Sequence, residues 1–275
     1  MSDDTDVFTA LESGKGDLMK TVTLQELFEA GVHYGHARAR WNPKMAPYLF
    51  GVRNGTHIID ITKTVNYLTS AMNLLKKVAI NGGRVLFVGT KMHAAPIIKE
   101  TADACGQYYV NHRWLGGMLT NWKTVALSIK KLEEMEKRLA TPEGLTKKEQ
   151  MQIERKREKL ERVIGGVRKM GGQPDALVVI DTLKEKTAIL EANRLGIPVI
   201  GIVDSNADPD IVKHLVPGND DAIRAIRLYC DCFQEAILTG LRESMKNSGV
   251  DLGTAAEVSP MEQLFAAQDT KKENS

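Results

Sequence analysis

Hydrophobic positions along the chain alternate between short continuous runs and longer runs spaced three or four residues apart. The continuous runs are RVLFVGT, QYYVNH, ALVVID and IPVIGIVD, at 84–90, 107–112, 176–181 and 197–204. They are rich in β-branched side chains, as in parallel strands that helices cover on both faces. Helical spacing is predicted for about 62–80, 94–105, 184–195 and 220–246. The pattern predicts an α/β fold, a Rossmann-like or flavodoxin-like doubly wound parallel sheet, with a short edge strand near 214–217.

The N-terminal part of this pattern predicts a short helix and then a loop. Thr23 and Glu26 fit a capping box, Gly31 ends the helix, and its apolar face is expected to be Leu24, Leu27 and Phe28. The following segment holds NP and NG turn signals, which favour a loop and a hairpin-like approach to a strand at 56–61.

The segment 120–170 breaks the alternation, because it contains no strand pattern. It has two helical patterns separated by ATPEGLT. The first carries Trp122, Val125, Ile129, Leu132, Met135 and Leu139, and the second carries Ile153, Leu160, Ile164 and Val167. Each helix has one thin apolar stripe, so the pair is expected to form a coiled-coil αα-hairpin that protrudes by about 30 Å.

These patterns divide the chain into four parts. We expect a disordered acidic N-terminal extension at 1–20, an α/β domain at 21–119 and 171–247, the protruding hairpin at 120–170, and a flexible C-terminal tail at 248–275.

The net charge of +2 conceals two basic zones between acidic ends. Residues 31–59 hold Arg38, Arg40, Lys44 and Arg53 and no carboxylate, while residues 123–169 hold fourteen Lys and Arg against eight Glu. Such zones favour a phosphate-bearing partner.

No apolar run approaches the ~18 residues of a membrane span, and the acidic N-terminus is unlike a signal peptide. A cytoplasmic location, without a membrane partner, is therefore expected.

Few residues suggest catalysis or metal binding. Asp181 and Asp204 end strands, and with Asp208 and Asp210 they could hold Mg²⁺, although an Asx-rich turn that caps the next helix is favoured. The segment FVGTK lacks the further glycines of a nucleotide loop, but Lys91 could meet an RNA phosphate. Cys105, Cys230 and Cys232 lack a partner pair at metal-ligand spacing, and paired ligation by His33 and His36 is disfavoured. We predict no cofactor and no small-molecule substrate, with a structural Mg²⁺ or Zn²⁺ ion as the alternative.

The segment HARARWNPK combines phosphate donors with a stacking ring and an amide, which favours RNA contact. Its candidates are Arg38, Arg40, Trp41, Asn42 and Lys44, with Arg53 further along; the alternative is a solvated loop with a buried Trp41. In the hairpin, RNA contact competes with a merely solvated charged face. Its candidates are Lys123, Lys130, Lys131, Arg155, Lys156 and Arg157.

The segment VNHRWLGGMLTNW joins the α/β domain to the hairpin. Gly116 and Gly117 change the direction of the chain, and Thr120 is a suitable N-cap for the next helix. Trp114 and Trp122 are expected to anchor the base of the hairpin, rather than to stack on RNA. For His112 and Arg113, RNA contact and burial at the hinge both remain open.

Long motifs in this chain resemble the bacterial small-subunit ribosomal protein S-two family. They include GVHYGHARARWNPKMAPYLFGVRNGTHIIDITKT, LFVGTK, VNHRWLGGMLTNWKT, GGQPDALVVID, EANRLGIPVIGIVD and PGNDDAIRAI, and the match covers about 24–240. The resemblance implies a flavodoxin-like domain with a coiled-coil hairpin and a non-catalytic role in translation. It also implies binding to 16S ribosomal RNA between head and body on the solvent side, and help in recruiting the messenger-binding ribosomal protein S-one.

Two other classes of function compete with this expectation. One is a nucleotide- or phosphate-using enzyme in which Asp181 and Asp204 hold a metal; it would bind a nucleotide specifically. The other is a protein-docking role in which the hairpin binds helices, and such binding would depend little on salt.

Overall fold

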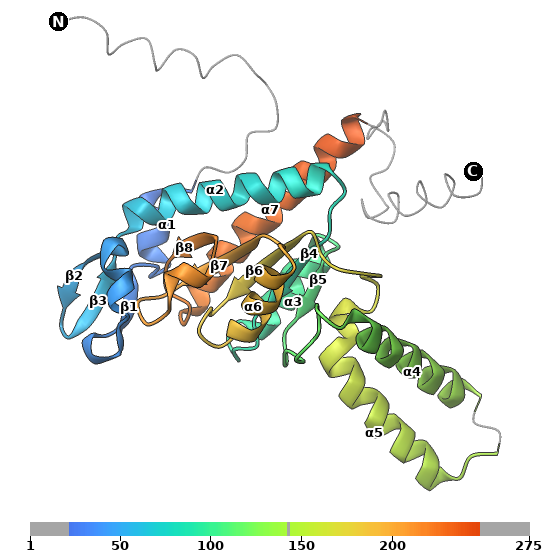
Figure 1. Ribbon diagram of the computed structural model, residues 1–275. Coiled ribbons are helices and arrows are strands. Elements are labelled where there is room, and N and C mark those ends of the chain that lie inside the picture. The colour runs from blue at the N-terminus through green and yellow to red at the C-terminus, as the bar shows by residue number, and fades with distance from the viewer. Residues whose placement is uncertain (1–21, 142–143, 248–275) are drawn as a thin grey trace, which may run out of the picture.

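The computed structural model describes residues 22–141 and 144–247, and in this part of the chain the strands form two sheets (Figure 1). The larger sheet is entirely parallel, with strand order β5-β4-β6-β7-β8. Its strands are β4 (Val85–Val88), β5 (Tyr108–Val110), β6 (Ala176–Ile180), β7 (Val199–Val203) and β8 (His214–Pro217). This order is that of flavodoxin-like folds, in which the direction of winding reverses beside the first strand. The predicted doubly wound parallel sheet is confirmed.

Alternation within the central strands divides the core into two layers. Phe87, Val178 and Ile200 belong to one buried cluster, while their neighbours Leu86 and Val179 belong to the other. Successive side chains of a strand point to opposite faces, so both faces must be covered by other elements. This explains why the strands are continuously hydrophobic.

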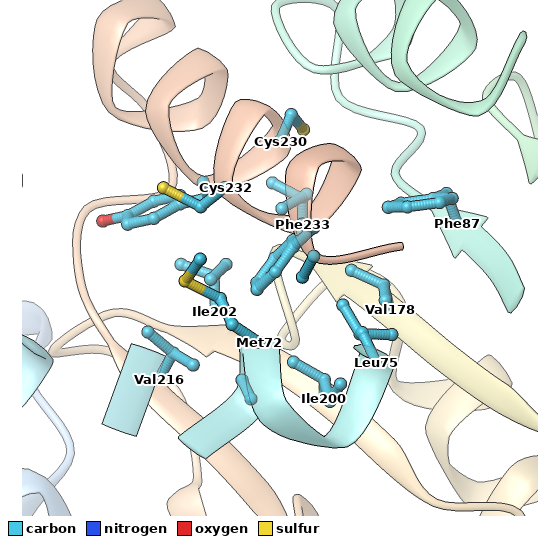
Figure 2. Close-up of a cluster of buried hydrophobic side chains, with 14 of the residues drawn as sticks. Met72, Leu75, Phe87, Val178, Ile200, Ile202, Val216, Cys230, Cys232 and Phe233 are labelled. Atoms are coloured by element: carbon cyan, nitrogen blue, oxygen red, sulfur yellow. The ribbon is translucent and has the colours of Figure 1, made fainter. Parts of the chain in front are cut away.

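Three helices cover the first face: α2 (Ile61–Ile80), α3 (Ala95–Ala104) and α7 (Ile223–Asn247). Figure 2 shows Phe233 of α7 lying among Met72 and Leu75 of α2 and the sheet residues Val178 and Ile200. The other face is covered by α6 (Lys186–Arg194) and by the base of the helical hairpin. Each end of every predicted helix in this domain lies within a few residues of the observed boundary.

The smaller sheet is antiparallel, with strand order β1-β3-β2, and it lies beyond β8 (Figure 1). Its strands are β1 (Tyr34–Ala37), β2 (Leu49–Arg53) and β3 (Thr56–Ile59). The NG turn between β2 and β3 has positive φ at Asn54 and Gly55, as two-residue hairpin turns require. The hairpin was predicted, but 34–37 was predicted to be loop, which is wrong: these residues pair with β3.

The short helix α1 (Leu24–Glu29) begins with the predicted capping box between Thr23 and Glu26. Its predicted apolar face is wrong in part, since only Leu27 is buried, whereas Leu24 and Phe28 are exposed. A single turn-and-a-half of helix offers the core only one position.

Helices α4 (Trp122–Ala140) and α5 (Lys147–Ile164) project together away from the sheet (Figure 1). Val125, Ile129 and Leu132 of α4 are buried, and they lie in the half of the helix nearest the sheet. At about 1.5 Å per residue the nineteen residues of α4 extend about 28 Å. The structure therefore contains a protruding pair of helices where the sequence indicated one. The expected terminal segments 1–20 and 248–275 lie outside the described residues.

Candidate functional site

The first basic zone lies on the antiparallel sheet and the loop that connects its strands. Arg38 and Arg40 belong to the short 3-10 helix η2 (Arg38–Arg40), and Arg53 ends β2. All three side chains are exposed, and none forms an ion pair with a residue in 22–141 or 144–247. Three guanidinium groups, each able to bind a phosphate through two N–H donors, are thus presented to solvent together.

Lys44 belongs to the same basic segment as Arg38 and Arg40, but it already has partners. Its Nζ is 2.6 Å from an Asp210 carboxylate oxygen and 3.1 Å from an Asp208 oxygen. Hydrogen bonds to Asp210 and Asp208 raise the pKa of Lys44 above its usual value. The structure thus places the predicted phosphate donor in an ion pair within the protein, which weakens its candidacy.

Trp41 has features of both roles that the sequence left open, RNA contact and burial for structural reasons. Its ring stacks on the buried His57 of β3, with centroids 4.8 Å apart and an interplanar angle of 23°. The side chain nevertheless remains 37% exposed. Asn42, by contrast, uses its amide oxygen internally, because it accepts a hydrogen bond from the Lys44 N–H at 3.0 Å. Its NH₂ group has no hydrogen-bond acceptor among the described residues and can serve an outside partner.

The second basic zone follows the projecting helices. Most of its candidates are exposed: Lys123, Lys130, Lys131, Arg155 and Lys156. Arg157 differs, since its guanidinium pairs with Glu154 one turn earlier at 2.7 Å. Between α4 and α5 lies a groove of about 540 Å³, lined by Met135, Ile153 and Leu160 together with five charged residues, namely Lys131, Glu134, Arg138, Lys156 and Lys159. The hairpin therefore carries exposed cations on both helices and around the groove between them.

The base of the hairpin is organised by Glu191 of α6, a residue that the sequence did not single out. One carboxylate oxygen accepts hydrogen bonds from the Trp114 indole N–H at 3.0 Å and from the Gly117 N–H at 2.8 Å. The other oxygen accepts from the N–H groups of Leu119 and Thr120, at 3.0 and 3.2 Å. Burial alone would raise the pKa of Glu191, but these hydrogen bonds lower it overall, so the carboxylate is held ionised.

This carboxylate also explains an error in the prediction for Thr120. The hydroxyl of Thr120 donates to Glu191 at 3.2 Å, and the N-cap of α4 is Asn121, whose side chain makes no capping hydrogen bond. The N-cap expectation for Thr120 is therefore wrong. Gly117 has a φ of +81°, which provides the change of direction that was expected there, whereas Gly116 has an ordinary negative-φ backbone and free space around it.

The other residues of this junction separate into packed and exposed groups. Trp114 and Trp122 are half-buried and pack against the core beneath α6, consistent with an anchoring role. His112 and Arg113 are exposed beyond the end of β5. Burial at the hinge, the alternative for these two residues, is wrong.

A cluster of ionisable side chains lies where strands β6, β7 and β8 end. Lys91 bridges Asp220 at 3.0 Å and Asp181 at 3.5 Å, and it also contacts Asp221. Burial lowers the pKa of Lys91, but the hydrogen bonds and charges of these aspartates raise it overall. The position after β4 was expected to offer Lys91 to RNA; instead its side chain is only 21% exposed and its ammonium group is held by three carboxylates.

The aspartates expected to share an ion do not form one group. Asp208 caps the 3-10 helix η5 (Pro209–Ile211) and pairs with Lys44, and Asp181 accepts a hydrogen bond from the Lys184 N–H. Asp208 thus performs the capping role that the sequence favoured, whereas the hydrogen bond of Asp181 belongs to the turn that precedes α6. Within 22–141 and 144–247 the residues close enough to share an ion are instead His36, Asp204, Asp220 and Asp221. Asp220 and Asp221 follow β8 in PGNDD, so the rule that sites collect at the carboxyl ends of parallel strands could have identified them.

His33 takes no part in that cluster. Its ring stacks between Phe28 and Tyr34, with centroid distances of 4.5 and 4.0 Å, and burial lowers its pKa.

None of the helices in the described parts of the chain is both long and apolar enough to cross a membrane.

Comparison with known proteins gives consistent results. Residues 27–240 match the family model described as Ribosomal protein S2. A protein of Rhodospirillum centenum named small ribosomal subunit protein uS2 is 59% identical over 248 residues, covering 90% of this chain and 95% of that protein. Proteins of the same name from Granulibacter bethesdensis and Rhodospirillum rubrum are 57% and 52% identical, covering 88% and 90% of this chain and 94% and 95% of their own lengths.

Proposed function

Since the chain belongs to the ribosomal protein S2 family, we propose that it binds 16S ribosomal RNA through the antiparallel sheet and the projecting helices. Family membership itself makes the protein a structural, non-catalytic component of the small ribosomal subunit, with a role in translation. The distribution of exposed charge on the described residues supports a particular RNA-binding surface within this role.

The observation that carries the proposal is that the guanidinium groups of Arg38, Arg40 and Arg53 form no ion pair within the described part of the chain. Elsewhere in the described chain several arginines pair with carboxylates, as Arg168 does with Glu136 and Arg227 with Glu100. An arginine left unpaired beside a half-exposed tryptophan provides both phosphate recognition and a stacking surface. The NH₂ group of Asn42 can add a hydrogen bond to the same partner.

The hairpin and its base extend the proposed surface. Its proposed contributors are the exposed residues His112, Arg113, Lys123, Lys130, Lys131, Arg155 and Lys156. Lys44, Lys91 and Arg157 are weaker candidates for RNA contact than these residues, because each already pairs with carboxylates of the protein. On the small subunit we propose a position on the solvent side between head and body, in the cytoplasm, and a contribution to recruiting ribosomal protein S-one.

Salt dependence of RNA binding tests the role of the arginines. Each phosphate contact contributes about 0.7–0.9 to the slope of log affinity against log salt concentration, because it releases a condensed counterion. Replacing Arg38, Arg40 and Arg53 with Gln should therefore reduce the slope for 16S RNA by about 2–3. The control replaces Lys77, Lys99 and Arg194 with Gln, which removes the same charge from exposed positions on α2, α3 and α6.

The control should leave the slope close to that of the parent protein. Equal slopes for the two triple variants would show that only total charge matters, and would refute the assignment of the antiparallel sheet. If the hairpin instead docks onto protein helices, binding to the subunit should change little between low and high salt.

A further inference from the structure

The groove between α4 and α5 has an apolar floor that the two helices do not cover. Met135 of α4 and Ile153 and Leu160 of α5 form this floor, and their side chains are only half-buried. The last buried side chain of α4 is Leu132, and the buried residue of α5 is Ile164, at the end of the helix nearest the sheet. Two helices alone cannot enclose the apolar side chains between them on both faces, so a further element is needed to bury this floor.

The rim of the groove is basic. Four cations line it against a single carboxylate, that of Glu134. The cations are Lys131, Arg138, Lys156 and Lys159. None of them forms an ion pair with another residue in 22–141 or 144–247. An apolar floor within a basic rim fits an amphipathic helix whose polar side is acidic.

The sequence that follows α7 contains a segment of this kind. Met261, Leu264 and Phe265 are spaced three and four residues apart, which is the spacing of one face of a helix. Ser259, with Glu262 three residues later, has the pattern of a capping box at a helix start, and Pro260 between them suits the first helical position.

The charge of the same segment is opposite to that of the rim. Between 251 and 269 the chain has four carboxylates and neither Lys nor Arg. The carboxylates belong to Asp251, Glu257, Glu262 and Asp269. Both the apolar side and the charged side of the segment therefore match the groove.

The tail begins at the end of the sheet from which the hairpin returns. Near the end of α7, Glu243 pairs with Lys76 of α2 at 2.7 Å. Just beyond α2, the Arg84 guanidinium donates to the Met170 carbonyl oxygen at 2.7 Å, and Met170 lies at the base of the hairpin. The last residues of α7 and the hairpin base thus both lie close to the segment that joins α2 to β4.

The tail is also long enough to reach the groove. Leu264 follows Asn247, the last residue of α7, by seventeen residues, and an extended chain of this length spans about 56–61 Å. A compact domain of about 200 residues is only about 40–45 Å across. The groove starts near the domain, because Leu160 lies about 6 Å, one helical turn, beyond the buried Ile164.

The acidic N-terminal extension is less well placed to fill the groove. The described chain begins at Val22, just before α1, and Figure 1 shows α1 beside the antiparallel sheet, which lies beyond β8. The projecting helices follow β5, at the opposite edge of the parallel sheet. Residues before Val22 would have to cross the whole sheet to reach them.

We propose that the C-terminal segment 259–269 docks in the groove between α4 and α5 as an amphipathic helix. Leu264 and Phe265 cover the apolar floor, and the carboxylates of Glu262 and Asp269 face the cations of the rim. The docked segment acts as a third helix of the hairpin and shields the groove from other partners. Under the proposed function, on which this consequence alone rests, RNA has to displace the tail before it reaches Lys131 and Lys156.

Photocrosslinking in the full-length protein tests the location of the tail. The photoreactive residue p-benzoylphenylalanine in place of Phe265 should crosslink, within one molecule, to peptides of α4 and α5 that contain Met135 or Ile153. The same residue in place of Leu252, earlier in the tail, is the control and should give little of this product. Crosslinks between two molecules, or to the exposed side chains of α1, would overturn the proposal.

Hydrogen exchange of the full-length protein measures how far the groove is covered. A tethered segment has an effective concentration of about 1 mM, so one with a dissociation constant of about 100–300 µM is docked most of the time, and its loss should speed exchange about four- to tenfold. Leu264→Asp/Phe265→Asp should therefore produce this increase at the α5 amides between Ile153 and Leu160. Val250→Asp/Leu252→Asp adds the same charge outside the segment and should leave the rates unchanged.

Charge reversal on α5 shows whether the tail acts through the groove. In a Lys156→Glu/Lys159→Glu protein the tail substitutions should cause no further increase in exchange, because the rim no longer attracts the tail. In an Arg155→Glu/Arg162→Glu protein, changed at exposed positions outside the groove, they should have their full effect.

Circular dichroism checks that each variant is folded, and the tail variants leave the described fold intact in sequence. Equal exchange by the parent and by Leu264→Asp/Phe265→Asp would overturn the proposal, since the groove would then be open in the isolated protein. No RNA is present in these measurements, so they succeed or fail independently of the proposed RNA surface.

Discussion

Replacing Glu191 with Ala should loosen the attachment of the projecting helices. The change removes the carboxylate that accepts from the Trp114 indole and from the N–H groups of Gly117, Leu119 and Thr120. Hydrogen bonds to a charged group contribute about 1.5–3 kcal/mol each when buried. Glu191 is only partly buried, and water can replace some of these bonds. We therefore expect a loss of about 2–4 kcal/mol in the free energy of unfolding, well below the simple sum.

Glu191→Gln should have an intermediate effect and a characteristic pH dependence. Its amide keeps one acceptor oxygen but turns an NH₂ group toward two of the donors, so we expect a loss of about 1–2 kcal/mol at neutral pH. The pKa of Glu191 is lowered in the folded protein from its ordinary value of 4.5. The stability that its charge contributes is therefore present above pH 4.5 and lost as the pH falls through the lowered pKa. The difference between parent and Gln variant should shrink in that acidic range.

Urea unfolding followed by tryptophan fluorescence measures this loss, because Trp114 and Trp122 lie at the base of the hairpin. Hydrogen exchange at the amides of Gly117, Leu119 and Thr120 localises it. Leu190→Ala, on the same helix with an exposed side chain, is the control and should change the free energy by less than about 0.5 kcal/mol. If Glu191→Ala unfolds like the control and its amides exchange no faster, the anchoring role is refuted.

Three further substitutions test the packing on which this account rests. Gly166→Ala should cost about 1–3 kcal/mol, since its Cβ would lie 2.2 Å from the Tyr109 carbonyl oxygen; Gly116→Ala, with free space, should be close to neutral in the same urea titration. Leu132→Ala, in the buried part of α4, should cost about 2–4 kcal/mol, whereas Leu127→Ala, at an exposed site on that helix, should cost little. Arg168→Ala breaks the ion pair with Glu136 at 2.6 Å; this pair is about one-third exposed, so thermal unfolding should show a loss of no more than about 1 kcal/mol.

The parallel sheet could be predicted because the hydrophobicity of each strand is visible in its own residues. A strand buried on both faces must be continuously hydrophobic, and 84–90, 176–181 and 197–204 show this directly. Strand β1 carries no such signal, because YGHA is short, half-exposed and defined only by its pairing with β3. Its place depends on contacts made elsewhere in the chain, which local periodicity does not record.

The sequence likewise revealed some residues of the candidate sites but not their partners. The sequence shows directly that one segment without acidic residues contains Arg38, Arg40 and Arg53. In the structure all three side chains are exposed, as expected for residues that bind an outside partner. The partners of Lys44 and Lys91 were not visible, because Asp208, Asp210 and Asp220 lie more than a hundred residues away along the chain. Glu191 was missed for the same reason: an isolated Glu in an amphipathic helix has the pattern of a solvated residue until the fold brings four donors to it.

The central claim is that the exposed arginines of the antiparallel sheet attach this protein to the small ribosomal subunit. Its most direct test is the amount of the protein in small subunits purified on sucrose gradients from cells that express Arg38→Glu/Arg40→Glu/Arg53→Glu as the only copy. We predict clearly reduced occupancy, while the isolated variant keeps the far-ultraviolet spectrum of the parent and a charge-matched Lys77→Glu/Lys99→Glu/Arg194→Glu protein is retained. Full occupancy of the folded arginine variant would contradict the claim.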